Sequence, residues 1–132
     1  MASTRLVILF ATPDTDARNR ACDALEQAGC RTLSAGDGAE ALELVRRERG
    51  RVDVVVLDLV MPKLGGVPAL RRIRAYAPRV SIVLACGDTG GVGGRLLGQR
   101  ADALLQKPFA RGDLFRAVQQ GLLQRRVRAG RR

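Results

Sequence analysis

Short apolar runs and longer amphipathic stretches alternate along this chain of 132 residues. The runs at 6–10, 54–57 and 80–85, with shorter segments at 31–35 and 103–105, are typical of β-strands. The run at 54–57 holds four apolar β-forming residues in succession, which suits a central parallel strand covered on both faces. We therefore predict five strands, with the buried central one at 54–57.

The segments between these strands carry apolar residues at helical spacing. The predicted helices follow the turns at 13–14, 37–38 and 65–66, and the last one begins at about residue 111. Another helix would fall at 87–98, where six glycines, each costing up to ~1 kcal/mol relative to alanine, predict a short or poorly ordered helix. The glycines lack a G-x-G-x-x-G frame and a following Lys-Ser or Lys-Thr, so we expect no nucleotide site there.

The alternation of strands and helices predicts an α/β fold, a parallel sheet with helices on both faces. The length suits one domain, which we expect at 1–124, followed by a basic tail at 125–132. No apolar run approaches the ~20 residues that a membrane-spanning helix needs. We therefore expect a cytoplasmic protein with no membrane partner.

Asp58 stands at the carboxyl end of the predicted central strand. In open α/β sheets this is the end at which ligands bind and chemistry occurs. Met61-Pro62 cannot continue the ladder of backbone hydrogen bonds, and Gly65-Gly66 let the chain turn into the next helix. The pattern thus predicts a carboxylate held at the mouth of a rigid sheet.

Two motifs in this sequence resemble those of a known family. The stretch D-L-V-M-P-K-L-G-G at 58–66 resembles the phospho-acceptor loop of the receiver domains of bacterial two-component response regulators, and K-P-F at 107–109 resembles their second hallmark. The resemblance extends from residue 5 to about residue 123. It implies a flavodoxin-like, doubly wound, five-stranded parallel sheet of order 2-1-3-4-5, with the site over strands one, three and five and a cis Lys107-Pro108 bond.

The resemblance also implies roles for individual residues. Asp58 matches the phospho-acceptor and Lys107 matches the lysine that pairs with the phosphoryl oxygens. Since strands three and five run toward the same edge and each ends in one of these residues, we expect the two side chains to lie close enough to pair. The backbone carbonyl of Val60 matches a metal-binding group. The family uses Mg²⁺, a hard cation that needs oxygen ligands such as carboxylates. A histidine kinase would be the phosphoryl donor.

Four positions depart from the family pattern. The acidic pair falls on Thr12 and Pro13, the phosphoryl-binding hydroxyl on Ala85, and the switch aromatic on Leu104. Asp14 is the only acid left beside the site, so we expect Mg²⁺ to bind weakly, if at all, through Asp14, Asp58 and Val60. The sequence therefore favours a pseudo-receiver, a protein-interaction module that is not an enzyme. The open alternative is a working phosphorelay receiver in which Asp14 and waters replace the acidic pair.

The net charge of +10 is unevenly distributed. Residues 1–66 hold 9 basic and 10 acidic side chains, whereas 67–132 hold 14 and 3. This asymmetry indicates a basic second half that could bind an acidic protein partner, or simply an arginine-rich composition. Nucleic-acid binding is the alternative from another class, and it is disfavoured because no aromatic residue interleaves with the basic tail.

Histidine and cysteine content narrows the chemistry further. The chain has three cysteines without C-x-x-C spacing and no histidine. A structural zinc site, a disulfide framework and a Ser-His-Asp arrangement are therefore not expected.

Overall fold

The computed structural model describes residues 5–91, 94–95 and 100–130. Five parallel strands form one sheet in the order β2-β1-β3-β4-β5, which confirms the predicted fold. The strands are β1 (Val7–Ala11), β2 (Arg31–Ala35), β3 (Val54–Asp58), β4 (Ser81–Cys86) and β5 (Ala103–Gln106). The helices are α1 (Thr15–Gln27), α2 (Gly38–Arg47), α3 (Gly66–Tyr76) and α5 (Arg111–Ala129).

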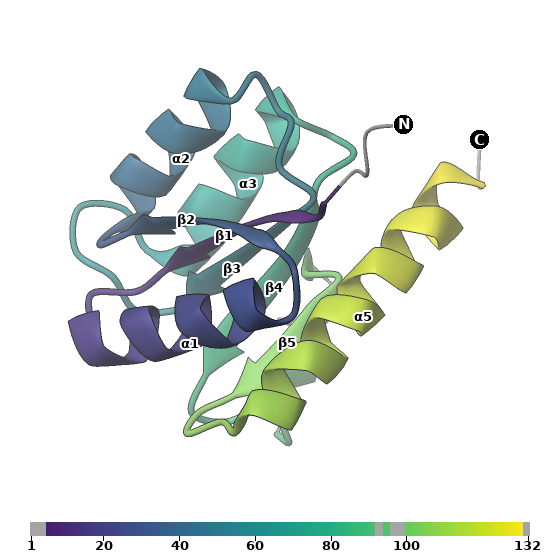
Figure 1. Ribbon diagram of the computed structural model, residues 1–132. Coiled ribbons are helices and arrows are strands. Elements are labelled where there is room, and N and C mark those ends of the chain that lie inside the picture. The colour runs from purple at the N-terminus through teal and green to yellow at the C-terminus, as the bar shows by residue number, and fades with distance from the viewer. Residues whose placement is uncertain (1–4, 92–93, 96–99, 131–132) are drawn as a thin grey trace.

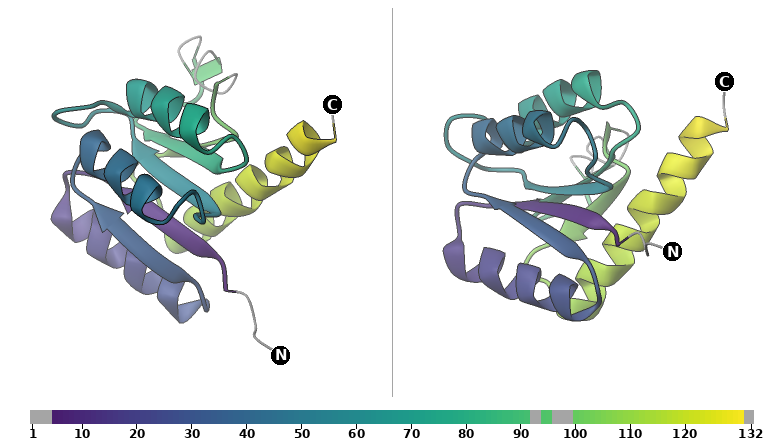
Figure 2. Two further views of the ribbon diagram at one scale, coloured as in Figure 1. Left: turned by 90° about the horizontal axis from the view of Figure 1, so that it is seen from above. Right: turned by 45° about the horizontal axis from the view of Figure 1, so that its top comes forward.

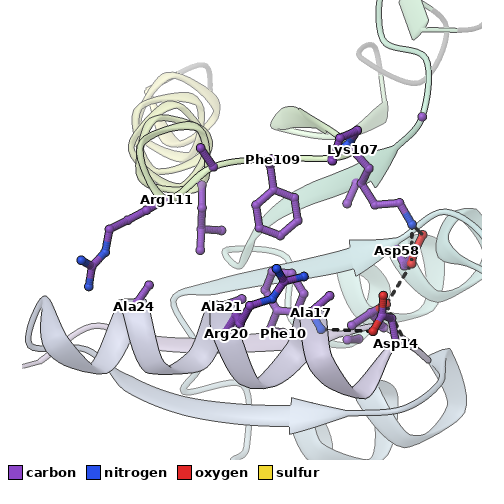
Figure 3. A pocket seen from close by; sticks show the side chains of 17 residues that line it. Phe10, Asp14, Ala17, Arg20, Ala21, Ala24, Asp58, Lys107, Phe109 and Arg111 are labelled. Atoms are coloured by element: carbon purple, nitrogen blue, oxygen red, sulfur yellow. Dashed lines mark hydrogen bonds and ion pairs between the residues drawn. The ribbon is translucent and has the colours of Figure 1, made fainter.

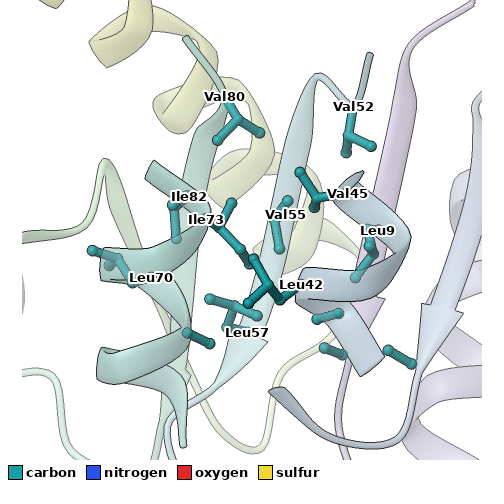
Figure 4. Packing of buried hydrophobic residues seen from close by; sticks show 14 of the residues in the cluster. Leu9, Leu42, Val45, Val52, Val55, Leu57, Leu70, Ile73, Val80 and Ile82 are labelled. Atoms are coloured by element: carbon teal, nitrogen blue, oxygen red, sulfur yellow. The ribbon is translucent and has the colours of Figure 1, made fainter. Parts of the chain in front are cut away.

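Helices cover both faces of the sheet: α1 and α5 lie on one side, and α2 and α3 on the other (Figures 1 and 2). Every residue of the central strand β3 is buried, and alternate side chains enter opposite layers. Val55 and Leu57 pack with α2 and α3 (Figure 4), whereas Val54 and Val56 pack with α1 and α5. The unbroken apolar run of the sequence thus fills two cores at once.

Side-chain caps begin the first two helices. Asp14 accepts a hydrogen bond from the N–H of Ala17 at the start of α1, and Asp37 does the same for Glu40 at the start of α2. These contacts satisfy backbone donors that the first helical turn leaves free. Gly66, by contrast, starts α3 where an added Cβ would lie 2.6 Å from the carbonyl oxygen of Asp58, so only glycine lets this helix approach the end of β3.

The last helix extends into the basic segment that was expected as a tail at 125–132. It continues to Ala129. Arg128 joins it to the domain by donating to both carboxylate oxygens of Asp102, a buried residue just before β5. Of the helix expected at 87–98, residues 87–91 are not helical, 94–95 are helical, and 92–93 and 96–98 lie outside the described residues. None of the described helices is long and apolar enough to span a membrane.

Candidate functional site

Asp58 and Lys107 meet at the carboxyl end of the sheet. Asp58 is the last residue of β3, and the ammonium of Lys107, directly after β5, lies 3.0 Å from Asp58 Oδ1 and 2.9 Å from Oδ2. The Asp58 side chain is 6% exposed and that of Lys107 is 41% exposed, so the lysine is the more solvated member of the pair. The predicted proximity and the predicted cis Lys107-Pro108 bond are confirmed, whereas the roles of the two residues stay predictions.

Thr12 holds the second oxygen of Asp58. The Thr12 side chain is buried, and its hydroxyl donates to Asp58 Oδ2 at 2.9 Å. The same hydroxyl oxygen accepts from the N–H of Asp14, and the Thr12 carbonyl oxygen accepts from the guanidinium of Arg18. Sequence reasoning treated Thr12 only as a missing acid and overlooked this contact. The hydroxyl itself was the available signal, since a buried Thr needs an acceptor.

The other positions considered for metal binding make contacts of their own, and of them Asp14 lines the same cavity as Asp58. Asp14 is used as the cap of α1, and Pro13 is exposed. The backbone N–H of Val60 lies 3.4 Å from Asp58 Oδ1, and the Val60 side chain is 77% exposed. Among the residues that the structure describes, no three His, Cys, Asp or Glu side chains gather as a metal site would require.

Ala85 and Leu104 occupy the other two departed positions. Ala85 is buried and sits opposite Asp58 in the register between β3 and β4, and Leu104 is half-buried on β5. Neither side chain can donate a hydrogen bond to a group on Asp58. The adjacent Cys86 does not replace them: burial raises the pKa of its thiol, and the protonated thiol donates to the carbonyl oxygen of Asp88 at 3.6 Å.

A cavity of about 710 Å³ extends from this pair between α1 and the start of α5 (Figure 3). Asp58, Lys107 and Thr12 lie at one end of it. Its apolar wall includes Phe109 and Phe10, whose ring centroids are 6.0 Å apart, and three alanines of α1. The carboxylate is therefore reachable from outside, through a cavity that is mostly apolar.

The model of the response regulator receiver domain matches residues 8–119. This chain belongs to the receiver domain family. Response regulator MprA of Mycobacterium leprae is 39% identical over 92 residues, which cover 69% of this chain and 39% of MprA. Sensor kinase CckA of Brucella abortus is 32% identical over 118 residues, which cover 87% of this chain and 12% of the kinase. These relatives assign the receiver domain to two-component signalling.

Solved structures agree with the fold. A receiver domain protein from Clostridium thermocellum matches with a TM-score of 0.80 at 26% identity, over 92% of this chain and 98% of that one. Chemotaxis response regulator CheY4 of Vibrio cholerae matches with a TM-score of 0.82 at 24% identity, over 90% of this chain and all of that one (100%). The chain spans only 12% to 39% of the two curated relatives above, MprA and CckA.

Receiver domains typically bind Mg²⁺ through acidic residues. The residues around Asp58 in this chain do not supply the acidic ligands that Mg²⁺ needs. Pro13 has no side-chain oxygen to offer a metal ion. The Thr12 hydroxyl is neutral and donates a hydrogen bond to Asp58. The Asp14 carboxylate accepts a hydrogen bond from the backbone N–H of Ala17 in α1. Asp58 and Asp14 are the two carboxylates that line the cavity; Lys107 pairs with Asp58, and Asp14 caps α1 through one of its oxygens, so no acidic pair stands beside Asp58 to hold Mg²⁺.

Proposed function

We propose that this receiver domain is a pseudo-receiver, a protein-interaction module whose output does not depend on phosphorylation of Asp58. The observation that carries the proposal is the set of donors around that carboxylate. Lys107 donates to both oxygens and Thr12 to one of them, so resident groups supply the positive charge and the hydrogen bonds. Such a site is structural, and the domain acts by binding and not by turning over a separate substrate.

A phosphorylatable receiver is the second candidate. Asp58 opens into a cavity with Lys107 beside it, and CckA, one of the relatives, is a sensor kinase. In this alternative a histidine kinase would donate a phosphoryl group to an Asp58 oxygen. The two candidates differ in one observable, the covalent state of Asp58.

Intact mass measurement separates them. Wild-type domain incubated with Mg²⁺ and acetyl phosphate is expected to keep its unmodified mass, because the site has too few carboxylates to hold the Mg²⁺ that would neutralise the transferring group. Asp58→Asn is the matched control. A gain of one phosphoryl group in the wild type that is absent in Asp58→Asn would establish the phosphorelay function and refute the pseudo-receiver.

The proposed partner surface lies on the second half of the chain. Leu123 and Val127, one turn apart on α5, are 55% and 46% exposed, and Arg116 and Arg126 are exposed on the same helix. An apolar pair flanked by cations suits an acidic protein partner. Arg116 pairs with Asp113 but its side chain is 73% exposed, whereas Arg125 contributes less, since it is half-buried and pairs with Asp53.

Charge reversal tests this surface. Arg116→Glu/Arg126→Glu is expected to lower capture of protein partners from the host lysate severalfold, and more so at low salt, since rim charges act mainly through long-range attraction. Asp58→Asn should capture the same partners as wild type. Partner capture that survives the double reversal but is lost in Asp58→Asn would contradict both the surface and the phosphorylation-independent output.

A further inference from the structure

A second hollow lies at the opposite end of the sheet from Asp58. It has a volume of about 570 Å³ and is formed by the loop after α2, the loop after α3 and Arg125 of α5. Four arginines and one aspartate are the charged residues that line it: Arg49, Arg51, Asp53, Arg79 and Arg125. We call this hollow the amino-end groove.

The acids near the amino-end groove are already engaged. The Asp53 carboxylate accepts a hydrogen bond from the backbone N–H of Val7 at 2.8 Å through Oδ2. Its Oδ1 lies 3.5 Å from the guanidinium of Arg125. Glu48 pairs with Arg31 at 2.8 Å, and Arg31 together with Arg51 lowers the pKa of the Glu48 carboxyl. Of the ion pairs found in the described part of the chain, none involves Arg49, Arg51 or Arg79, all three of which are exposed. The groove therefore keeps a strong positive charge.

An aromatic side chain shares the groove with these arginines. Tyr76, the last residue of α3, is 45% exposed and lines the groove, and its hydroxyl lies 3.5 Å from the carbonyl oxygen of Arg46. In the sequence alone, nucleic-acid binding is disfavoured because no aromatic residue interleaves with the basic tail. The fold changes this, since it brings Tyr76 to the same groove as Arg125, a residue 49 positions later.

We propose that the amino-end groove binds single-stranded nucleic acid. Guanidinium groups match phosphate oxygens in geometry and charge, and an exposed aromatic ring gives a base a surface on which to stack. A double helix keeps its bases stacked on one another and cannot use Tyr76 in this way. A small anion or an acidic peptide would use the arginines but leave the tyrosine without a role. The groove is distant from Asp58, so this binding is independent of the pseudo-receiver proposal.

The test is fluorescence anisotropy with a labelled oligothymidylate of about 12 nucleotides, within the range that one single-strand binding site covers. Arg51→Glu/Arg79→Glu is expected to weaken binding at least tenfold and to lower the slope of log K against log salt by about 1.4, or about 0.7 for each lost phosphate contact. Arg71→Glu/Arg72→Glu is the matched control. It makes the same charge change at exposed positions of α3 that do not line the groove, and is expected to cost less than about threefold.

Substitution of Tyr76 tests the stacking. Tyr76→Ala is expected to weaken binding roughly tenfold, and Tyr76→Phe should stay within about twofold of wild type. Circular dichroism and thermal melting of every variant check that the fold is retained. The proposal would be overturned by any of three results. The two arginine double variants could lose affinity equally, Tyr76→Ala could lose none, or a duplex of the same length could bind as tightly as the single strand. Binding to anionic lipid vesicles without binding to the oligonucleotide would overturn it too, and would assign the groove to a membrane surface.

Discussion

A Thr12→Asp/Pro13→Asp double variant is expected to bind Mg²⁺ at least tenfold more tightly than wild type, which we expect to remain unsaturated at about 10 mM. The substitutions place two carboxylates beside Asp58, where wild type has a neutral hydroxyl and a proline ring. Pro13 is exposed, so its replacement removes no buried contact. Isothermal titration with Mg²⁺ measures the change.

The same double variant is also expected to have a stability that depends on Mg²⁺. Without metal, the new acid at position 12 faces Asp58 with only Lys107 to offset the two charges, and this like-charge contact is expected to cost about 1–2 kcal/mol of unfolding free energy. Mg²⁺ should restore the loss, because a ligand that binds only the native state stabilises it in proportion to the logarithm of its concentration. Wild type should show no such rise in melting temperature.

Gln119→Glu/Gln120→Glu is the matched control, since it adds two carboxylates at exposed positions of α5, away from Asp58. It should bind Mg²⁺ no better than wild type. A wild-type Kd below about 1 mM would show that the wild-type residues suffice for metal binding. An unchanged affinity in the correctly folded double variant would show that the acidic pair is not what the site lacks.

Asp102→Ala is expected to lower the free energy of unfolding by about 3 kcal/mol. This is the low end of the range for breaking a buried ion pair, and we choose it because both arginine partners are partly exposed. The Asp102 side chain is 4% exposed, and it pairs with Arg74 at 2.6 Å and with Arg128 at 2.8 Å. Its Oδ2 also accepts from the N–H of Ile82. Removing the carboxylate leaves two guanidinium groups and a buried backbone donor without this acceptor.

Urea unfolding monitored by circular dichroism measures this loss. Glu43→Ala is the control, since the Glu43–Arg47 pair is exposed at 57% and 69% and its loss should cost less than about 0.5 kcal/mol. The C-terminal turns of α5 should also show faster amide hydrogen exchange in Asp102→Ala, because Arg128 donates to Asp102 and to the carbonyl oxygens of Pro78 and Val80. A cost as small as that of Glu43→Ala would mean that α5 is held by its apolar face alone.

Local pattern determined the helices and strands, and the resemblance to receiver domains supplied the order of the strands. Apolar runs and helical spacing are properties of neighbouring residues, so they predicted the strands and four of the helices directly from the chain. Parallel strands end at one edge of a sheet, so the positions of Asp58 and Lys107 after their strands were enough to predict that the two side chains meet.

Contacts between distant segments were decided only by the tertiary structure. From the sequence, Thr12 is only a position that lacks the expected acid. In the structure β1 and β3 are adjacent, and the Thr12 hydroxyl donates a hydrogen bond to Asp58. From the sequence, residues 125–129 are part of an expected basic tail. In the structure they belong to α5, and Arg128 donates a hydrogen bond to Asp102. The amino-end groove joins three segments with no common motif. Side-chain pairing of this kind depends on the relative placement of elements, which periodicity along the chain does not encode.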